Sequence, residues 1–432
     1  MPSDSSHAKN FLDRLFHGQN KEQLLQRLSP HHTAPVQHVP GGAHITPEIV
    51  ERRWHRIIAP PETRESLLSS ADMEQMSTYS RNIENFIGMT RLPLGLAGPL
   101  RVNGLFAQGD YYLPLATTEA ALVASYHRGA CLISQVGGCS AMLLAEGVSR
   151  SPGFAFATAR QAGLFAAWVI EHLDEIRSAA QSTTRHGSLE DLRITIEGNH
   201  VYLLMEFRTG DASGQNMATI ATEAACALIR EQSPVKPDYF FVEANMSGDK
   251  KASAQSFLTV RGKKVTAEAI IPAELVAQTL HTTPGRMSDY WRMSAMGGVL
   301  SGTIGVQGHY ANGLAALYIA CGQDAACIAE SAVGVTRFEV RPDGALYAAV
   351  TLPNLMVGSV GGGTALPSQK ACLELMGLYG EGHARALAEV CAGMALAGEL
   401  SIIGALAAGE FTRAHRKLAR GNEQTANGAC HD

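Results

Sequence analysis

Four charged residues stand in contexts that could serve acid–base chemistry. Glu119 lies in LATTEAALVAS, Lys250 in EANMSGDKKAS, Asp324 in YIACGQDAAC and His415 in FTRAHRKLAR. Side chains of these types transfer protons, and an ammonium group can also stabilise negative charge that develops on a reacting oxygen. The four are therefore candidate catalytic residues if the fold brings them together.

Each candidate also has a structural explanation. Two threonines before Glu119 can cap a helix, and a carboxylate in its first turn contributes about 0.3–1 kcal/mol through the helix dipole. Lysines after a Ser-Gly-Asp turn are often solvated, although an apolar strand leads into the turn of Lys250. Asp324 stands in an apolar segment expected to be helical, where burial requires a partner, so a site and a structural ion pair fit equally. His415, in a basic run, fits a solvated histidine.

Two glycine-rich segments could bind phosphate. They are TGDASGQNMATI and VGSVGGGTALPSQ, and each places glycine before an expected helix, where backbone N–H groups are free to bind anions. No Gly-x-Gly-x-x-Gly motif stands between a strand and a helix, so a Rossmann site is not supported. Both segments are equally compatible with tight helix starts.

The composition excludes several classes of protein. The 432 residues are 46% hydrophobic, and a net charge of −5 gives no field that would attract nucleic acid or anionic lipid. The eight cysteines show no Cys-x-x-Cys and no zinc spacing, so we expect reduced thiols and no metal. No apolar run reaches roughly 18 residues and the N-terminus resembles no targeting signal, which predicts a cytoplasmic protein.

The periodicity of apolar residues predicts an α+β protein. In the first part of the chain we expect helices over 21–28, 47–58 and 62–76. Short strands and turns are expected over 92–115, with a long helix from about residue 117.

A change of pattern marks an inserted α+β unit after residue 150. A helix over 155–180, a strand pair within 192–207 and a helix over 214–231 are predicted there. After it we expect a hairpin within 256–271, turning at Arg-Gly-Lys, and helices of small residues over 311–332 and 366–408.

Seven motifs carry a family resemblance. The chain is similar, from about residue 84 to 420, to the 3-hydroxy-3-methylglutaryl-CoA reductase family, in which the same motifs occur in the same order. They are ENFIGMTRLPLGLAGPL, LATTEAALVAS, TGDASGQNM, GDKKA, YIACGQDAA, VGGGT and LAGELSIIGALAAG.

The resemblance implies a domain plan. After a helical N-terminal region (1–83), a large, helix-rich CoA-binding domain (84–150 and 243–432) would be interrupted by a small NADP-binding domain (151–242). The small domain would be α+β, ferredoxin-like and not of Rossmann type. Family sites form between subunits, which implies a homodimer or homotetramer.

The resemblance also implies roles for the four candidates. Lys250 would stabilise the oxyanion of a thioester under reduction, kept protonated by a buried Asp324. His415 would protonate the departing CoA thiolate, and a buried, protonated Glu119 would supply the proton for a second reduction. Two hydrides are needed, because reduction of a thioester to an alcohol takes four electrons.

Further residues match the family's binding positions. The substrate residues would be Arg150, which suits a carboxylate, together with Ser125, Asn245, Asp249, Lys251, His309 and Asn312. The cofactor residues would be Asp211, Ser213, Gly214, Gln215 and Asn216, with Arg185 matching the arginine that binds the 2′-phosphate of NADPH, which favours NADPH over NADH.

Some positions depart from the family pattern. Glu243 stands where the membrane-anchored eukaryotic branch has serine near the substrate carboxylate, and Gln215 replaces a common methionine. The resemblance thus implies NADPH-dependent reduction of 3-hydroxy-3-methylglutaryl-CoA to mevalonate and CoA, a step of isoprenoid biosynthesis. The alternatives are the same chemistry on another acyl-CoA, which Glu243 motivates, and a non-enzymatic CoA- or nucleotide-binding relative.

Overall fold

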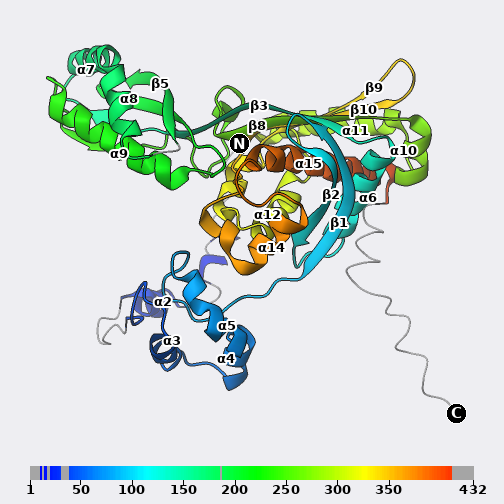
Figure 1. Cartoon of the computed structure of the whole chain (residues 1–432), viewed down its shortest axis with the longest axis horizontal. Coiled ribbons are helices and arrows are strands. Elements are labelled where there is room, and N and C mark those ends of the chain that lie inside the picture. Colours follow the sequence, from blue (N-terminus) through cyan, green and yellow to red (C-terminus); the bar gives the residue numbers. More distant parts are fainter. Residues whose placement is uncertain (1–9, 12–13, 17–19, 31–37, 185–186, 411–432) are drawn as a thin grey trace. The chain divides into compact units, whose positions relative to one another are not determined.

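The computed structural model describes residues 10–11, 14–16, 20–30, 38–184 and 187–410 (Figure 1). The chain forms two compact units, Met1–Thr90 and Arg91–Asp432. Two predicted site residues, Arg185 and His415, lie outside the described residues.

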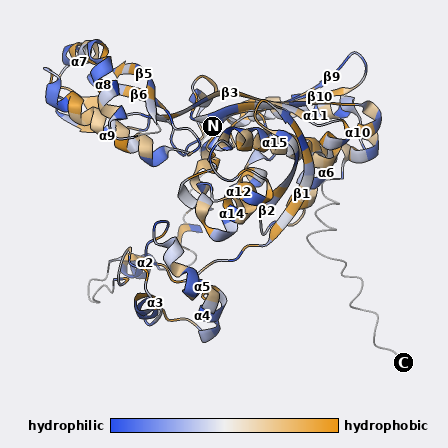
Figure 2. Cartoon of the chain, viewed as in Figure 1, coloured by the Kyte–Doolittle hydropathy of each residue, from blue (hydrophilic) through white to orange (hydrophobic). Residues whose placement is uncertain are grey.

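The first unit is helical, as predicted. Its helices are α2 (Lys21–Leu28), α3 (Pro47–Trp54), α4 (Pro61–Leu67) and α5 (Ser70–Gln75), and hydrophilic residues are prominent on them in Figure 2. The single helix predicted over 62–76 is wrong, because Leu68 is extended and Ser69 starts α5 with a capping box to Asp72. The buried guanidinium of Arg53 donates to carbonyl oxygens of Pro40, Gly42, His44 and Phe86, which ties the loops to α3.

Unit 2 contains a large sheet with the strand order β2-β1-β3-β8-β10-β9. In that order the strands are β2 (Gln108–Ala116), β1 (Leu94–Gly104), β3 (Cys139–Arg150), β8 (Gly262–Ile271), β10 (Leu346–Leu355) and β9 (Val335–Val340). Strand β1 runs parallel to β3, and all other neighbours are antiparallel.

The hairpin predicted within 256–271 is wrong. Only β8 is a strand, since Ala254–Phe257 is a 3-10 helix, and β8 pairs with β3 and β10 instead of with its own neighbour in sequence. Gly262 has φ +94°, and a Cβ there would lie 2.4 Å from the carbonyl oxygen of Leu355. The glycine therefore allows close approach of β10, and the Arg-Gly-Lys sequence is not a turn.

The inserted α+β unit is present. Along the chain it contains β4 (Gly153–Ala155), α7 (Ala159–Glu171), α8 (Leu173–Gln181), β5 (Ser188–Glu197), β6 (His200–Arg208), α9 (Gln215–Gln232) and β7 (Tyr239–Phe241). Its sheet has the order β7-β4-β6-β5, all antiparallel, which is the ferredoxin-like arrangement expected. The helix predicted over 155–180 is two helices, which break at His172.

Strand β3 belongs to both sheets. Its first residues pair with β1 and β8, whereas Val148, Ser149 and Arg150 pair with β6 in the small sheet. In Figure 1 the strand runs from the large sheet into the small one. Arg150 thus lies at the end of a strand held in two ladders.

One long helix, α15 (Ala384–Ala408), is buried on nearly every side. It contacts β1, β3, β8 and β10 as well as the helices around it, which are α6 (Leu122–Gln135), α10 (Ala273–Leu280), α11 (Pro284–Ser301) and α12 (Tyr310–Ala320). Among the described residues it is the one helix long and apolar enough to cross a membrane, but 89% of its apolar window is buried inside the protein. It is a core helix by packing.

Small residues let α15 approach its neighbours. A Cβ on Gly129 of α6 would lie 1.9 Å from the carbonyl oxygen of Ala397. Two buried carboxylates on α15 find backbone donors, since Glu389 accepts from Leu105, Phe106, Ala107 and Leu143, and Glu399 from Gly308 and His309. Buried charges are thus satisfied by loops that the helix holds in place.

We expect Gly129→Ala to lower the free energy of unfolding by about 1–3 kcal/mol, because α6 and α15 must separate to admit the methyl group. Urea unfolding measures the change. The control is Gly163→Ala in α7, where nothing lies within 4 Å of the added Cβ, and helix propensity should leave stability equal or raised. Equal stability of the Gly129→Ala variant and the unmodified protein would contradict this packing.

Candidate active site

Lys250 and Asp324 form an ion pair between two loops. Nζ of Lys250 lies 2.8 Å from Oδ2 of Asp324, and the two side chains are 39% and 40% exposed. The expectation that Asp324 lies in a helix is wrong. It lies in the turn after α12, where it caps the 3-10 helix Ala325–Cys327 and accepts from the N–H of Ala326 at 3.0 Å. Lys250 is the partner expected for Asp324. The expected burial of Asp324 is not found, because the pair is half-exposed in one chain.

Each partner shifts the pKa of the other. The hydrogen bond to Asp324 raises the pKa of Lys250 despite partial burial. Burial acts to raise the pKa of Asp324, but hydrogen bonds from Lys250 and from the N–H of Ala326 outweigh it and lower that pKa. Near neutral pH the pair is therefore an ammonium and a carboxylate.

Glu119 lies beside Asn312. Nδ2 of Asn312, in the first turn of α12, donates to Oε2 of Glu119 at 3.2 Å. The helix expected from about residue 117 begins later, at Leu122, because Ala121 has φ +72°. Glu119 therefore precedes the helix, its N–H bonded to Oγ1 of Thr117, and its side chain is exposed in one chain instead of buried.

His309 is fixed as a neutral imidazole next to these residues. Its ring stacks on Tyr126 with centroids 5.0 Å apart, and Nε2 lies 2.8 Å from the carbonyl oxygen of Gly398. Burial lowers the pKa of His309 to about 4. Because a carbonyl only accepts, Nε2 carries the proton and Nδ1 remains an acceptor.

Ser125 lies in the first turn of α6, directly before Tyr126. Its Oγ donates to Oγ of Ser401 at 3.0 Å, and Nε of Arg128 donates to the same oxygen at 3.0 Å. Ser125 is thus joined to α15 through a shared hydroxyl.

Arg150 is buried and already paired. Its side chain is 7% exposed, Nη1 lies 2.8 Å from Oδ2 of Asp249, and Nε donates to Oγ1 of Thr219 at 2.8 Å. Nζ of Lys251 donates to the carbonyl oxygen of Asp249 at 2.8 Å. The expected substrate residues Arg150, Asp249 and Lys251 therefore form one cluster.

Glu243 has a role within its own loop. Its carboxylate accepts from the N–H of Ser151 at 3.2 Å, the N–H of Asn245 at 2.7 Å and Oγ of Ser247 at 3.0 Å. Both oxygens are thus occupied in holding the turn, including Asn245, whose φ is +69°. The negative charge is bound by donors of the loop.

Sequence reasoning missed Arg261 and Glu330. Nε of Arg261 lies 2.7 Å from Oε2 of Glu330, and the two side chains are 2% and 0% exposed. Arg261 also pairs with Asp249. A signal for Glu330 existed, since it lies in the same apolar segment as Asp324. The requirement that a buried carboxylate have a cationic partner applies to Glu330, not to the half-exposed Asp324.

The two glycine-rich segments lie side by side. Ala212 forms a bridge with Val360, and the N–H of Ser359 donates to the carbonyl oxygen of Asp211 at 2.9 Å. A Cβ on Gly358 would lie 2.6 Å from the backbone nitrogen of Ser213, so glycine is required for this approach. The carboxylate of Asp211 accepts from two backbone N–H groups. One belongs to Gly382, just before α15, and the other to Ala384, the first residue of that helix.

Helix α9 begins in this region with no side-chain cap from any residue that the structure describes. Gly214, with φ +72°, precedes it without a side-chain cap, so N–H groups of its first turn, which contains Gln215 and Asn216, are available to an anion. Nε2 of Gln215 lies 2.8 Å from Sγ of Cys327. This arrangement fits the phosphates of a dinucleotide. Among the described residues no group of three His, Cys, Asp or Glu side chains could hold a metal ion.

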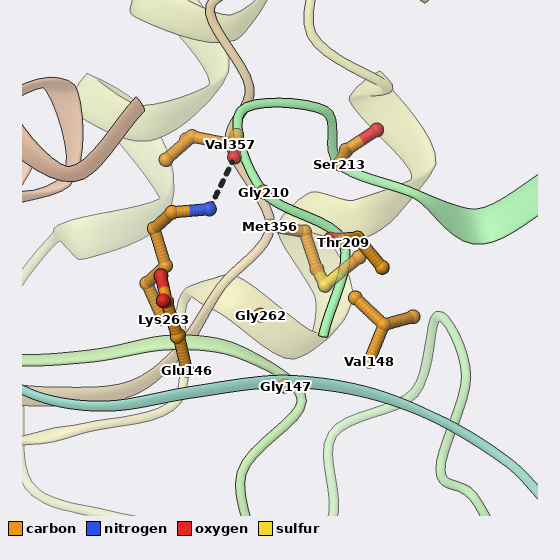
Figure 3. Close-up of a pocket in the computed structure, with 10 residues that line it drawn as sticks. All are labelled: Glu146, Gly147, Val148, Thr209, Gly210, Ser213, Gly262, Lys263, Met356 and Val357. Atoms are coloured by element: carbon orange, nitrogen blue, oxygen red, sulfur yellow. Dashed lines mark hydrogen bonds between the residues drawn. The ribbon is translucent and has the colours of Figure 1, made fainter. Parts of the chain in front are cut away.

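A small pocket lies where β3, β8 and the loop after β6 meet (Figure 3). Thr209, Gly210 and Ser213 line it from the loop, and the buried Lys263 donates to the carbonyl oxygen of Val357 at 3.2 Å. Burial lowers the pKa of Lys263. The loop after β6 thus lies against the strand shared by the two sheets.

Comparisons with known proteins agree with this fold. The class II 3-hydroxy-3-methylglutaryl-CoA reductase from Streptococcus pneumoniae, solved bound to NADPH in open conformations, superposes with a TM-score of 0.63 at 21% identity, covering 83% of this chain and 96% of that one. The chain therefore has the fold of this class of reductase structures.

The sequence comparisons identify the family. A family model described as hydroxymethylglutaryl-coenzyme A reductase matches residues 49–420. The 3-hydroxy-3-methylglutaryl-coenzyme A reductase of Pyrococcus horikoshii is 44% identical over 79% of this chain and 84% of its own length, and that of Methanothermobacter thermautotrophicus is 43% identical over 82% and 88%. The chain belongs to the hydroxymethylglutaryl-CoA reductase family.

We expect Asp324→Asn to move the alkaline limb of the kcat/KM profile to lower pH. Asp324 raises the pKa of Lys250, so without the carboxylate the ammonium loses its proton at a lower pH. We also expect kcat to fall by ~10²–10³-fold. The control is Asp110→Asn, which removes an exposed pair with Arg101. An unchanged alkaline limb would show that Lys250 does not carry the titrating proton.

Proposed function

We propose that the protein reduces 3-hydroxy-3-methylglutaryl-CoA to mevalonate and free CoA while two NADPH are oxidised. The observation that carries the proposal is the Lys250–Asp324 pair, in a chain of this family. The thioester accepts two hydrides and two protons. Its C–S bond breaks between the two reductions, and of these two protons one ends on the sulfur of the departing CoA and the other on the oxygen of the product alcohol.

Lys250 is proposed to act on the carbonyl oxygen. Its ammonium donates a hydrogen bond to the oxygen on which charge develops, in both reductions, and loss of one such donor typically costs ~3–4 kcal/mol. Asp324 keeps this group protonated and directs it. The raised pKa of Lys250 supports the assignment, because a neutral amine would not serve.

Proton transfer is proposed for Glu119 and His415. Glu119, oriented by Asn312, supplies a proton to the second carbonyl reduction, and His415 protonates the CoA thiolate so that it does not attack the aldehyde again. His415 follows α15 in the sequence and lies outside the described residues, so its role rests on the family motif.

The substrate residues are proposed to lie at two ends of the acyl group. Arg150, Lys251, Asp249 and Asn245 bind the terminal carboxylate, and Arg150 exchanges its bond to Asp249 for a bond to the substrate. Ser125, His309 and Asn312 line the other end. The three donors to Glu243 weigh against a different acyl group, because its charge is already bound within the loop.

NADPH supplies the hydride and is proposed to bind at the paired glycine-rich segments. Gly214, Gln215 and Asn216 offer the helix start to its phosphates. Asp211, which bonds to the facing segment, and Ser213, whose backbone lies against Gly358, are proposed to line the same cofactor site. Arg185, outside the described residues, is proposed to bind the 2′-phosphate that distinguishes NADPH from NADH. The domain bounds 1–83, 84–150 with 243–432, and 151–242 also stay proposals, as does a cytoplasmic location.

A homodimer or homotetramer is proposed as the working form. The half-exposed Lys250–Asp324 pair and the exposed Glu119 leave the site open in one chain. An apolar face on α11 that is exposed among the described residues, suited to a subunit interface, supports the proposal. It carries Met293, Met296, Val299 and Leu300.

The reaction is tested by its stoichiometry. We expect two NADPH oxidised and one mevalonate formed per 3-hydroxy-3-methylglutaryl-CoA, followed by absorbance at 340 nm and mass spectrometry, with slower turnover of NADH. Lys250→Ala should abolish the activity while Arg208→Ala, at an exposed surface pair, should not. If a panel of other acyl-CoA thioesters is reduced and this one is not, the substrate assignment is wrong.

The assembly is tested on α11. We expect Val299→Asp to lower the mass found by light scattering and to lower kcat together, because a charge on the apolar face would separate the subunits. The control is Leu164→Asp on α7, another exposed apolar side chain. A Val299→Asp variant of unchanged mass and activity would place the interface elsewhere.

A further inference from the structure

The turn that carries Lys250 has a strained backbone. Asn245, Gly248 and Lys250 all have φ between +57° and +70°. A residue other than glycine in this region costs on the order of 1–3 kcal/mol and persists only when its surroundings hold it. The backbone N–H of Lys250 has a specific partner, since it donates to Oε1 of Glu330 at 3.3 Å.

Glu330 is itself fixed from the other side. Its carboxylate is fully buried, and Oε2 accepts from Nε of Arg261 at 2.7 Å. The remaining donors of Arg261 reach the side chain of Asp249 and, at 2.7 Å, the carbonyl oxygen of Ser149 at the end of β3. Arg261 therefore connects Glu330 to the residue before Lys250 and to the shared strand.

One short segment thus contacts Lys250 twice. Asp324 binds the ammonium group, and Glu330, six residues later, binds the backbone N–H. We propose that Glu330, held by Arg261, is a positioning residue that fixes the backbone of Lys250 so that its ammonium stays on Asp324 and faces the substrate carbonyl. The proposal rests on the catalytic role proposed for Lys250.

The alternative is that Arg261 and Glu330 only stabilise the core. Buried ion pairs often contribute little net stability compared with apolar residues of the same shape. A purely structural pair needs no contact with the backbone of a strained residue. The two explanations differ in what happens to Lys250 when Glu330 changes.

The main test compares two buried carboxylates. Glu330→Gln leaves an NH2 group facing either the N–H of Lys250 or Nε of Arg261, and it should lower kcat by ~10²-fold, as a misplacement of about 1 Å can, with the KM for NADPH little changed. Glu389→Gln is the control, since Glu389 is also fully buried and accepts backbone N–H groups away from this cluster. It should lower the melting temperature similarly but leave kcat within about twofold of the unmodified enzyme.

A second readout does not depend on activity. The rate at which an amine-reactive acylating reagent modifies Lys250, relative to the neighbouring Lys251, is measured by peptide mass spectrometry. Freed from Asp324, Lys250 should react several-fold faster in Glu330→Gln and not in Glu389→Gln. An unchanged ratio with unchanged kcat would overturn the positioning role. If the unmodified protein instead fails to reduce the thioester, the proposed function fails, and the labelling ratio still decides the role of Glu330.

A third measurement applies if Glu330→Gln does not fold. Hydrogen exchange at the amide of Lys250 in the unmodified protein should be slow for a surface turn, because Glu330 holds it. Exchange as fast as that of an unstructured peptide would overturn the proposal.

Glu330→Asp is a further variant. It keeps the charge for Arg261 but shortens the reach of the side chain, and it should reproduce the loss of kcat with a smaller loss of stability.

Discussion

A helix can be buried on every side only if its neighbours come close and its polar groups find partners, and α15 imposes both conditions on unit 2. Gly129 meets the first condition, because its lack of a side chain lets α6 approach α15. The second condition is met by buried carboxylates that accept backbone N–H groups of neighbouring loops. Glu399 accepts in this way from the N–H of His309, at the start of α12. The same helix α12 carries Asn312 to Glu119. Packing of an apolar helix and geometry of the candidate site are therefore parts of one arrangement.

The charges of the site form two connected layers. The outer layer is the half-exposed pair of Lys250 and Asp324, which is open to a substrate. The inner layer contains Asp249 between Arg150 and Arg261, with Glu330 behind them, where burial strengthens each interaction. Two arginines face two carboxyl groups in the inner layer. Asp249 is shared by both arginines, so it keeps a partner in Arg261 when its bond to Arg150 is absent.

The sequence predicts local features well and distant contacts poorly. The bounds of α2 and the strand pair β5–β6 follow from periodicity and turn residues, which act within a few positions. The hairpin at Arg-Gly-Lys was wrong because β8 pairs with strands far away in the chain. Asp324 was also expected in a helix, although a local signal ends α12 before it, since Gly322, with φ +66°, follows the C-cap residue Cys321. The pair of Arg261 and Glu330 depends on two loops that meet only in the folded chain.

The pairing of β3 with both sheets limits how the two sheets can move relative to one another. Hydrogen bonds to β8 fix its first part and hydrogen bonds to β6 fix its last part, and the change of partner falls at Gly147 and Val148. The small sheet therefore cannot slide along the large one without breaking a ladder. A rotation of the small sheet relative to the large one would therefore twist β3 near Gly147, three residues before Arg150. Such a twist would reach Arg150, whose guanidinium pairs with Asp249 in the turn that carries Lys250.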